Sequence, residues 1–136
     1  MKNSTLKTLV FDLGGVYFTT GTYLAIEKIK DMFEIKDKER IETLKMIFSS
    51  EPDTPGCKLR KGMISMEKFE TELLEQMDLT ESARRHIRHI WFSSYVPNYK
   101  MEEIVKKLTE THRLLIFSGN VRERIRYLDK RYGFLQ

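Results

Sequence analysis

The chain has 136 residues, of which 40% are hydrophobic and 11% aromatic, and a net charge of +4. This length predicts one compact domain, or one domain with a smaller appendage, and the composition argues against intrinsic disorder. No apolar run approaches the ~20 residues that span a bilayer, and the short apolar stretch before Asp12 is unlike a signal peptide. A single cysteine, Cys57, excludes an intrachain disulfide and fits a reducing compartment, so we expect a cytoplasmic protein.

The basic excess raises nucleic-acid binding as an alternative. Basic residues concentrate in Arg84–His89 and in Arg122–Arg131, with apolar or acidic residues interleaved. Runs of this kind are typical of solvated helix faces, and no nucleic-acid-binding motif accompanies them. Nucleic acid is therefore a disfavoured partner.

The N-terminal part of the chain predicts one strand followed by helices. Leu6–Phe11 is a short strand that becomes fully apolar just before Asp12, and Gly14-Gly15 break it because glycine reaches backbone angles closed to other residues. Apolar residues at helical spacing then predict helices at 22–33 and 38–48.

The middle of the chain predicts a loop and two more helices. Two prolines and two glycines favour a loop over 49–62. Ser65 is predicted to cap the next helix, and Thr80 the one after it. The apolar face of that second helix is predicted to comprise Ala83, Ile87, Ile90 and Trp91.

The C-terminal part predicts a helix, a second strand and a last helix. Pro97 and Asn98 favour a turn before a helix at 100–109. Its buried residues are predicted to be Met101, Ile104, Val105 and Leu108. Arg113–Phe117 is an apolar strand of the kind that is covered on both faces. A final helix at 121–131 is predicted to stop at Gly133.

Two strands that each end in a polar loop before a helix predict a parallel α/β sheet. Ligands in such sheets bind beyond the carboxyl ends of the strands, where Asp12 and Ser118 fall. The segment between the strands is too long for a plain connection. We therefore expect its helices to form an insertion over the site.

Two segments resemble motifs of the haloacid dehalogenase (HAD) superfamily of hydrolases. Leu9–Val16 (LVFDLGGV) is similar to motif I, an apolar strand followed by an aspartate. Leu114–Asn120 (LLIFSGN) is similar to motif II, an apolar strand followed by serine or threonine. The resemblance covers essentially the whole chain. It implies a Rossmann-like HAD core at 1–20 and 96–136, with a helical cap inserted at 21–95.

By this resemblance the protein is a Mg²⁺-dependent phosphatase of a small phosphorylated metabolite, acting through an aspartyl-phosphate on Asp12. The Asp12 carboxylate, which is ionised at neutral pH, would be the nucleophile. Asp12 and the carbonyl group of Gly14 would ligate Mg²⁺, which prefers oxygen ligands. Ser118, Gly119 and Gly15 would bind the phosphoryl oxygens.

The chain also departs from the superfamily's pattern. Gly14 stands where its phosphatases usually carry a second aspartate, the general acid and base. The lysine motif and the later acidic metal ligands have no counterpart before Gln136. A two-stranded sheet leaves edges and apolar faces uncovered, so we expect a fragment of a longer enzyme or, as an alternative, completion by self-association into a homo-oligomer.

Two other functions stay open. A truncated, catalytically inactive HAD-like fold would bind a partner or phosphate without turnover. Asp12–Gly15 also resembles the first phosphate loop of actin-like and sugar-kinase ATPases, although that loop joins two strands, whereas a helix is predicted from residue 22 here. The histidines lack metal-ligand spacing, and Cys57 has no histidine nearby in the sequence to activate it, so we expect neither to be functional.

Overall fold

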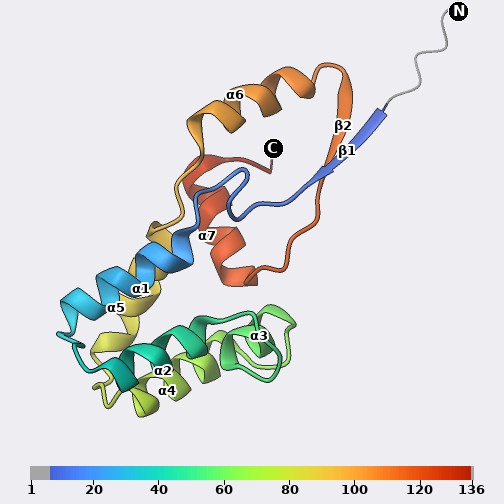
Figure 1. The fold of residues 1–136 in the computed structure, drawn as a ribbon. Helices are drawn as coiled ribbons and strands as arrows, with labels where there is room; N and C mark the ends of the chain where they lie inside the picture. Colours follow the sequence, from blue (N-terminus) through green and yellow to red (C-terminus); the bar gives the residue numbers. More distant parts are fainter. Residues whose placement is uncertain (1–6, 136) are drawn as a thin grey trace, which may run out of the picture.

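A computed structural model describes residues 7–135, so Leu6, the first residue of the predicted strand, lies outside the described residues. Strands β1 (Lys7–Phe11) and β2 (His112–Ile116) pair in parallel, with Lys7 opposite His112 and Phe11 opposite Ile116. The predicted parallel sheet is confirmed, and both strands end at the same edge (Figure 1). In the described residues β1 is followed by α1 and not by a second strand of a hairpin, which removes the structural basis for the actin-like alternative.

Six helices separate the two strands in the sequence, and a seventh follows β2 within residues 7–135. They are α1 (Gly21–Met32), α2 (Lys38–Phe48), α3 (Pro55–Arg60), α4 (Met66–Gln76), α5 (Ala83–Ser93), α6 (Tyr99–Leu108) and α7 (Arg122–Tyr132). Figure 1 shows α1 to α5 gathered at one end of the molecule, with the sheet and α6 at the other and α7 between them. The predicted fold class, a HAD-like parallel sheet with an inserted set of helices, is confirmed.

Local sequence accounts for several helix ends. The Ser65 hydroxyl accepts a hydrogen bond from the Lys68 N–H at 3.1 Å, which confirms the predicted cap of α4. Asp37 caps α2 in the same way through the Glu39 N–H at 3.2 Å. Gly133 ends α7 in the left-handed conformation at φ 64°, as predicted, because glycine adopts this conformation without steric cost.

Two local predictions are wrong. The segment 49–62 is not all loop, because α3 forms inside it. Thr54 caps α3 by accepting from the Cys57 N–H at 3.2 Å, and Pro55 fits the first helical turn, where its missing N–H would be unpaired anyway. The residue that precedes α5 is Ser82 and not Thr80, whose hydroxyl is hydrogen-bonded to that of Ser82 instead.

The hydrophobic core is concentrated in residues 21–95, the helical segment. Trp91 of α5 lies at its centre, with ring centroids 4.9 Å from Phe48 and 5.3 Å from Phe69. A second aromatic group joins the loop after β1 to the end of the chain, because Phe18 packs against Tyr132 and Phe134 at 5.9 and 5.1 Å. These two groups hold the helical segment and the loop after β1 in place.

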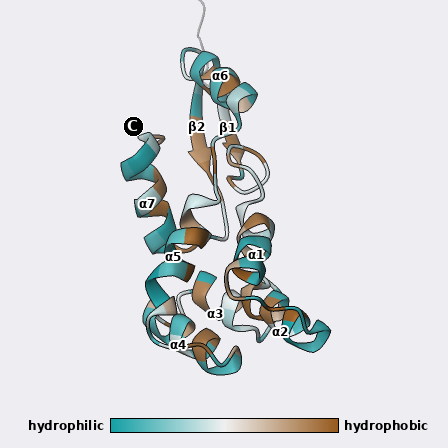
Figure 2. Ribbon diagram, turned by 90° about the vertical axis from the view of Figure 1, so that its left-hand side faces the viewer, coloured by the Kyte–Doolittle hydropathy of each residue, from teal (hydrophilic) through white to brown (hydrophobic). Residues whose placement is uncertain are grey.

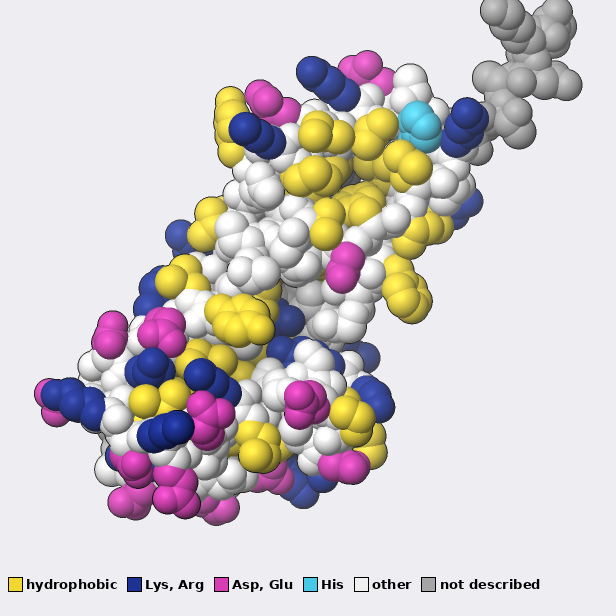
Figure 3. All heavy atoms as spheres, in the orientation of Figure 1, with side chains coloured by type: hydrophobic (Ala, Val, Ile, Leu, Met, Phe, Trp, Pro, Cys, Tyr) yellow, Lys and Arg dark blue, Asp and Glu magenta, His cyan; other side chains and the backbone are white. Residues whose placement is uncertain are grey.

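The sheet, in contrast, is largely uncovered. Val10 in β1 is 60% exposed and Phe117, just after β2, is 81% exposed. Figure 3 shows apolar side chains gathered on this part of the surface, and the end of β2 has the colour of hydrophobic residues in Figure 2. The expected uncovered apolar surface is therefore confirmed, while the prediction that the second strand is covered on both faces is wrong. The prediction of a buried face on α6 is also wrong, since this helix packs mainly against β2 and has no fully buried residue.

The chain enters and leaves the helical segment at one place. The Thr19 N–H donates to the Val96 carbonyl at 2.9 Å, and the Asn98 N–H donates to the Tyr17 carbonyl at 2.7 Å. Residues 17–19 and 96–98 therefore lie side by side between the sheet and helices α1 to α5. Across residues 7–135, no helix combines the length and apolar character needed to cross a membrane.

Candidate active site

Asp12 lies in a tight turn directly after β1. Its carboxylate accepts a hydrogen bond from the Leu13 N–H at 2.7 Å. The Leu13 carbonyl in turn accepts from the Val16 and Phe18 N–H groups at 3.1 and 2.8 Å. Gly15 has φ 77°, a conformation that glycine adopts readily, so the turn depends on a glycine at this position. The Asp12 side chain is exposed at the mouth of this turn.

The end of β2 brings Ser118 to the same edge of the sheet. The Phe117 N–H donates to the Phe11 carbonyl at 3.1 Å, so pairing continues up to the residues that precede Asp12 and Ser118. The Ser118 hydroxyl accepts from the Asn120 amide at 3.3 Å. Ser118 does not cap α7, since Val121 precedes that helix and its N–H donates to the Asn120 side chain at 3.0 Å. The hydroxyl therefore has no role in closing the helix.

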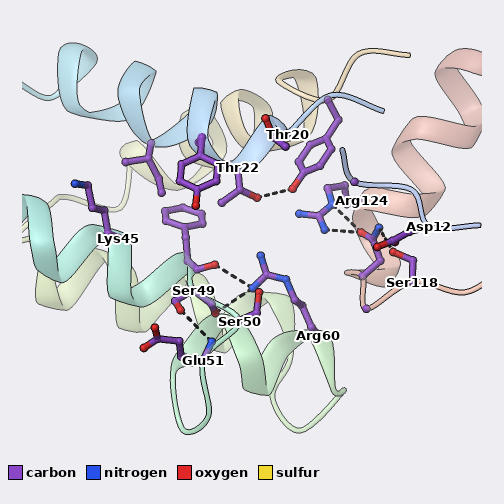
Figure 4. Close-up of a pocket in the computed structure, with 17 residues that line it drawn as sticks. Asp12, Thr20, Thr22, Lys45, Ser49, Ser50, Glu51, Arg60, Ser118 and Arg124 are labelled. Carbon is purple, nitrogen blue, oxygen red and sulfur yellow. Dashed lines mark hydrogen bonds between the residues drawn. The ribbon is translucent and has the colours of Figure 1, made fainter. Parts of the chain in front are cut away.

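A pocket of about 700 Å³ opens at this edge (Figure 4). Asp12, Gly14, Ser118 and Gly119 line it on the side of the sheet. Thr20 and residues of the helical segment line the opposite side; the latter are Thr22, Tyr23, Ile26, Lys45, Phe48, Ser49, Ser50, Glu51, Arg60 and Tyr95. Four of the five predicted site residues thus share one cavity, while Gly15 shapes the turn and does not line it.

Two arginines in the pocket were missed by sequence reasoning. Arg124 of α7 is only 2% exposed, and its Nε and Nη2 atoms donate to the Asn120 side-chain oxygen at 2.8 and 2.5 Å. Arg60 of α3 donates from Nη1 to the carbonyls of Phe48 and Ser49 at 3.0 and 3.1 Å. The interpretation of 122–131 as a solvated basic face is therefore wrong for Arg124. Its position one turn after the motif II residues was the available signal.

Burial lowers the pKa of both arginines. Desolvation lowers the pKa of Arg124 to about 10, with Arg60 contributing in the same direction as a neighbouring cation. Desolvation also lowers the pKa of Arg60. Both guanidinium groups are still protonated at neutral pH, so this part of the pocket is electropositive.

A series of hydrogen bonds between side chains fixes the pocket wall behind Arg124. The Trp91 indole N–H donates to the Thr22 hydroxyl at 3.1 Å, and that hydroxyl is hydrogen-bonded to the Tyr95 hydroxyl. The Arg124 guanidinium carbon lies 5.0 Å from the Trp91 ring centroid and 4.3 Å from that of Tyr95. Cation–π contacts of this kind favour a cation held at the ring face.

The metal-ligating capacity of the pocket is limited. Within residues 7–135 no three histidine, cysteine, aspartate or glutamate side chains lie together as a metal group. Two carboxylates line the pocket, and Figure 4 shows Asp12 and Glu51 at opposite ends of it. Cys57 is buried in α3, away from the pocket lining.

Several known proteins resemble this chain in sequence or in fold. No family model matches the chain. An uncharacterized protein of Dictyostelium discoideum is 26% identical over 97% of this chain, which spans 56% of that protein. A HAD family enzyme of Bacteroides thetaiotaomicron, solved with magnesium and inorganic phosphate, matches 93% of the chain with a TM-score of 0.65 and 22% identity. Its aspartate-to-alanine mutant, solved with the same ligands, gives a TM-score of 0.72.

A HAD-like family hydrolase of Porphyromonas gingivalis matches 90% of the chain with a TM-score of 0.53 and 20% identity. The chain spans 59% of the Bacteroides enzyme and 55% of the Porphyromonas protein. Identities at this level establish the fold. Over the part of that fold which it spans, the chain has the α/β fold of the HAD-like hydrolases.

Proposed function

We propose that this protein is a Mg²⁺-dependent phosphatase of the HAD type, with Asp12 as nucleophile. The observation that carries the proposal is the meeting of Asp12 and Ser118 on one wall of the pocket, although 105 residues of sequence lie between them. Both side chains follow parallel strands at the edge where such sheets bind ligands. We also assign 21–95 to a helical cap and 1–20 with 96–136 to the core, because the chain crosses between them at residues 17–19 and 96–98.

The geometry suits nucleophilic phosphoryl transfer. A carboxylate oxygen of Asp12 would form a bond to the phosphorus atom while the bond from phosphorus to the ester oxygen breaks, and that oxygen would take a proton from water and leave as an alcohol. The Ser118 hydroxyl and the Gly119 N–H would donate hydrogen bonds to the other phosphoryl oxygens. Water would then hydrolyse the aspartyl-phosphate, which restores the Asp12 carboxylate and releases phosphate.

The oxygen donors present fit a magnesium ion that keeps part of its water shell. The Asp12 carboxylate and the Gly14 carbonyl would hold it, and phosphate oxygens and water would complete an octahedron. Bound there, Mg²⁺ would offset the repulsion between carboxylate and phosphate. The Bacteroides enzyme with this fold was solved with magnesium and inorganic phosphate, which supports the choice of metal and ligand.

Metal-dependent release of phosphate from an aryl phosphate tests the proposal. We expect turnover by the chain with Mg²⁺, none with a chelator, and loss of turnover in Asp12→Asn. Ser118→Ala should lower the rate because one donor to the phosphoryl oxygens is removed. Asp31→Asn, an exposed aspartate on α1, is the matched control and should behave as the wild type. Equal rates in Asp12→Asn and the wild type would refute the assignment.

Phosphate binding without turnover is the second candidate function. It is favoured by Gly14, which leaves the pocket without a general acid at that position, and by the single carboxylate beside Ser118. In that case inorganic phosphate would bind the chain, and no variant would release phosphate from an ester.

A further inference from the structure

Two guanidinium groups lie on the pocket without a carboxylate partner. Arg60 and Arg124 both line the cavity, and Figure 4 shows them on different elements facing the space between them. None of the ion pairs formed by the described part of the chain includes either residue. Arg124 is buried and Arg60 partly buried, and an unpaired cation removed from water is unfavourable, so a pocket lined by both is suited to an anionic ligand.

Arg124 has an unused hydrogen-bond donor. Its Nη1 atom is buried and has no partner among the described residues, while Nε and Nη2 share the single oxygen of the Asn120 side chain. Buried donors are paired in the great majority of cases. The free Nη1 of this lining residue is therefore a donor that a ligand oxygen can satisfy.

The two guanidinium groups are also held in place before any ligand binds. Arg60 is fixed by the carbonyls at the end of α2, and Arg124 by Asn120 and the Tyr95 ring. Fixed planar guanidinium groups match the geometry of carboxylate and phosphate oxygens. Lys45 adds a further positive charge to the lining, while Asp12 and Glu51 are the negative groups that face the cavity.

We propose that Arg60 and Arg124 form a second anion-binding subsite, so that the substrate is a phosphate ester carrying a further carboxylate or phosphate group. The inference rests on the proposed function for the position of the scissile phosphate at Asp12 and Ser118. Arg60 reaches the cavity from the helical segment, on the other side from Asp12 (Figure 4). The further anionic group of the substrate would bind there while the scissile phosphate stays at the turn that holds Asp12.

Calorimetric binding to the full chain tests this subsite. Asp12→Asn serves as the background because turnover would otherwise obscure binding. Glycerol 3-phosphate is compared with 3-phosphoglycerate, which adds a carboxylate, and fructose 6-phosphate with fructose 1,6-bisphosphate, which adds a phosphate. We expect the second member of at least one pair to bind about tenfold more tightly or better, because its extra hydrogen bonds are charge-assisted. The pair that shows the preference identifies the anion.

Arg60→Gln and Arg124→Gln should each abolish that preference, whereas Lys61→Gln, next to Arg60 but outside the pocket lining, should retain it. Circular dichroism checks folding, and if Arg124→Gln is unfolded, Arg60→Gln decides the outcome alone. No preference in either pair, or one that survives Arg60→Gln, overturns the subsite. Preference without hydrolysis by the wild type would refute the proposed phosphatase and keep the subsite. Hydrolysis by the wild type without a binding preference would support the proposed phosphatase and refute the subsite.

Discussion

The guanidinium carbon of Arg124 in α7 lies 4.3 Å from the centroid of the Tyr95 ring, just beyond the end of α5. The same ring contacts Gly21, the first residue of α1, so closely that a Cβ atom at Gly21 would lie 2.4 Å from Tyr95 Cδ2. Tyr95 thus connects α1 with α7, the helix that follows β2. The wall of the pocket depends on the absence of a side chain at position 21.

Gly21→Ala should therefore destabilise the protein. The methyl group would displace Tyr95 or push α1 away from α5, and overpacking of this kind costs about 1–3 kcal/mol. Urea denaturation followed by circular dichroism measures the free energy of unfolding. Gly119→Ala is the matched control, since a Cβ atom there meets nothing within 4 Å and should leave stability unchanged. Equal stability of both variants would show that Tyr95 can move freely.

Arg88→Met should also lower stability, because it removes a partner from a buried acid. Glu70 in α4 is 2% exposed and accepts from Arg88 Nε at 2.9 Å, with Arg84 Nη1 at 3.7 Å from its other oxygen. A buried carboxylate that loses a partner costs about 1–3 kcal/mol, and Arg84 offsets part of this. Arg85→Met, at an exposed position on the same helix, should have little effect in the same urea titration.

The part of the site that could be predicted from the sequence is the pair of residues at the ends of the two strands. Asp12 and Ser118 each follow an apolar strand, and the parallel pairing of these strands places both at one edge. That inference needs only local patterns and a rule about sheets. Arg60 and Arg124 could not be found in this way. Their approach depends on how α3 and α7 pack around Trp91, and a basic residue in a helix is exposed far more often than buried.

The wrong predictions about the fold have similar causes. Four consecutive apolar residues, Leu114–Phe117, predict a strand that is covered on both faces, but burial depends on the layers that pack against the sheet. Among the helices in residues 7–135, α6 makes the main contact with β2, and Phe117 is left exposed. The helix α3 was missed because Pro55 and Gly56 indicate a loop by composition, although proline is also favoured in the first turn of a helix.

Mg²⁺ should bind more tightly in the presence of phosphate than alone. A single side-chain carboxylate and a carbonyl leave most of the octahedron to other ligands, and phosphate oxygens supply some of them. We expect the affinity for Mg²⁺, measured by calorimetry, to rise on the order of tenfold when inorganic phosphate is present, a usual size for coupling between two bound ligands. Asp12→Ala should remove this increase, while Glu51→Gln at the far end of the pocket should retain it. Strong Mg²⁺ binding without phosphate would indicate further ligands.

Gly14→Asp should raise the phosphatase rate. A Cβ atom at Gly14 meets nothing within 4 Å, and this glycine lines the pocket two residues after the proposed nucleophile. Its φ is not among the positive values, so an aspartate fits the backbone as it stands. There the carboxylic acid could donate a proton to the leaving oxygen, and general acid catalysis contributes about 10²–10⁴-fold.

The pH dependence of hydrolysis distinguishes proton donation from a mere change of shape. In Gly14→Asp the added rate should fall as pH rises, because the acid must be protonated to donate. Gly14→Asn has nearly the same shape and cannot supply this proton, so its rate should stay near that of the wild type. A similar gain in both variants would show that the increase comes from contacts with the substrate. A lower rate in both variants would show that catalysis depends on the backbone at Gly14 and not on a missing acid.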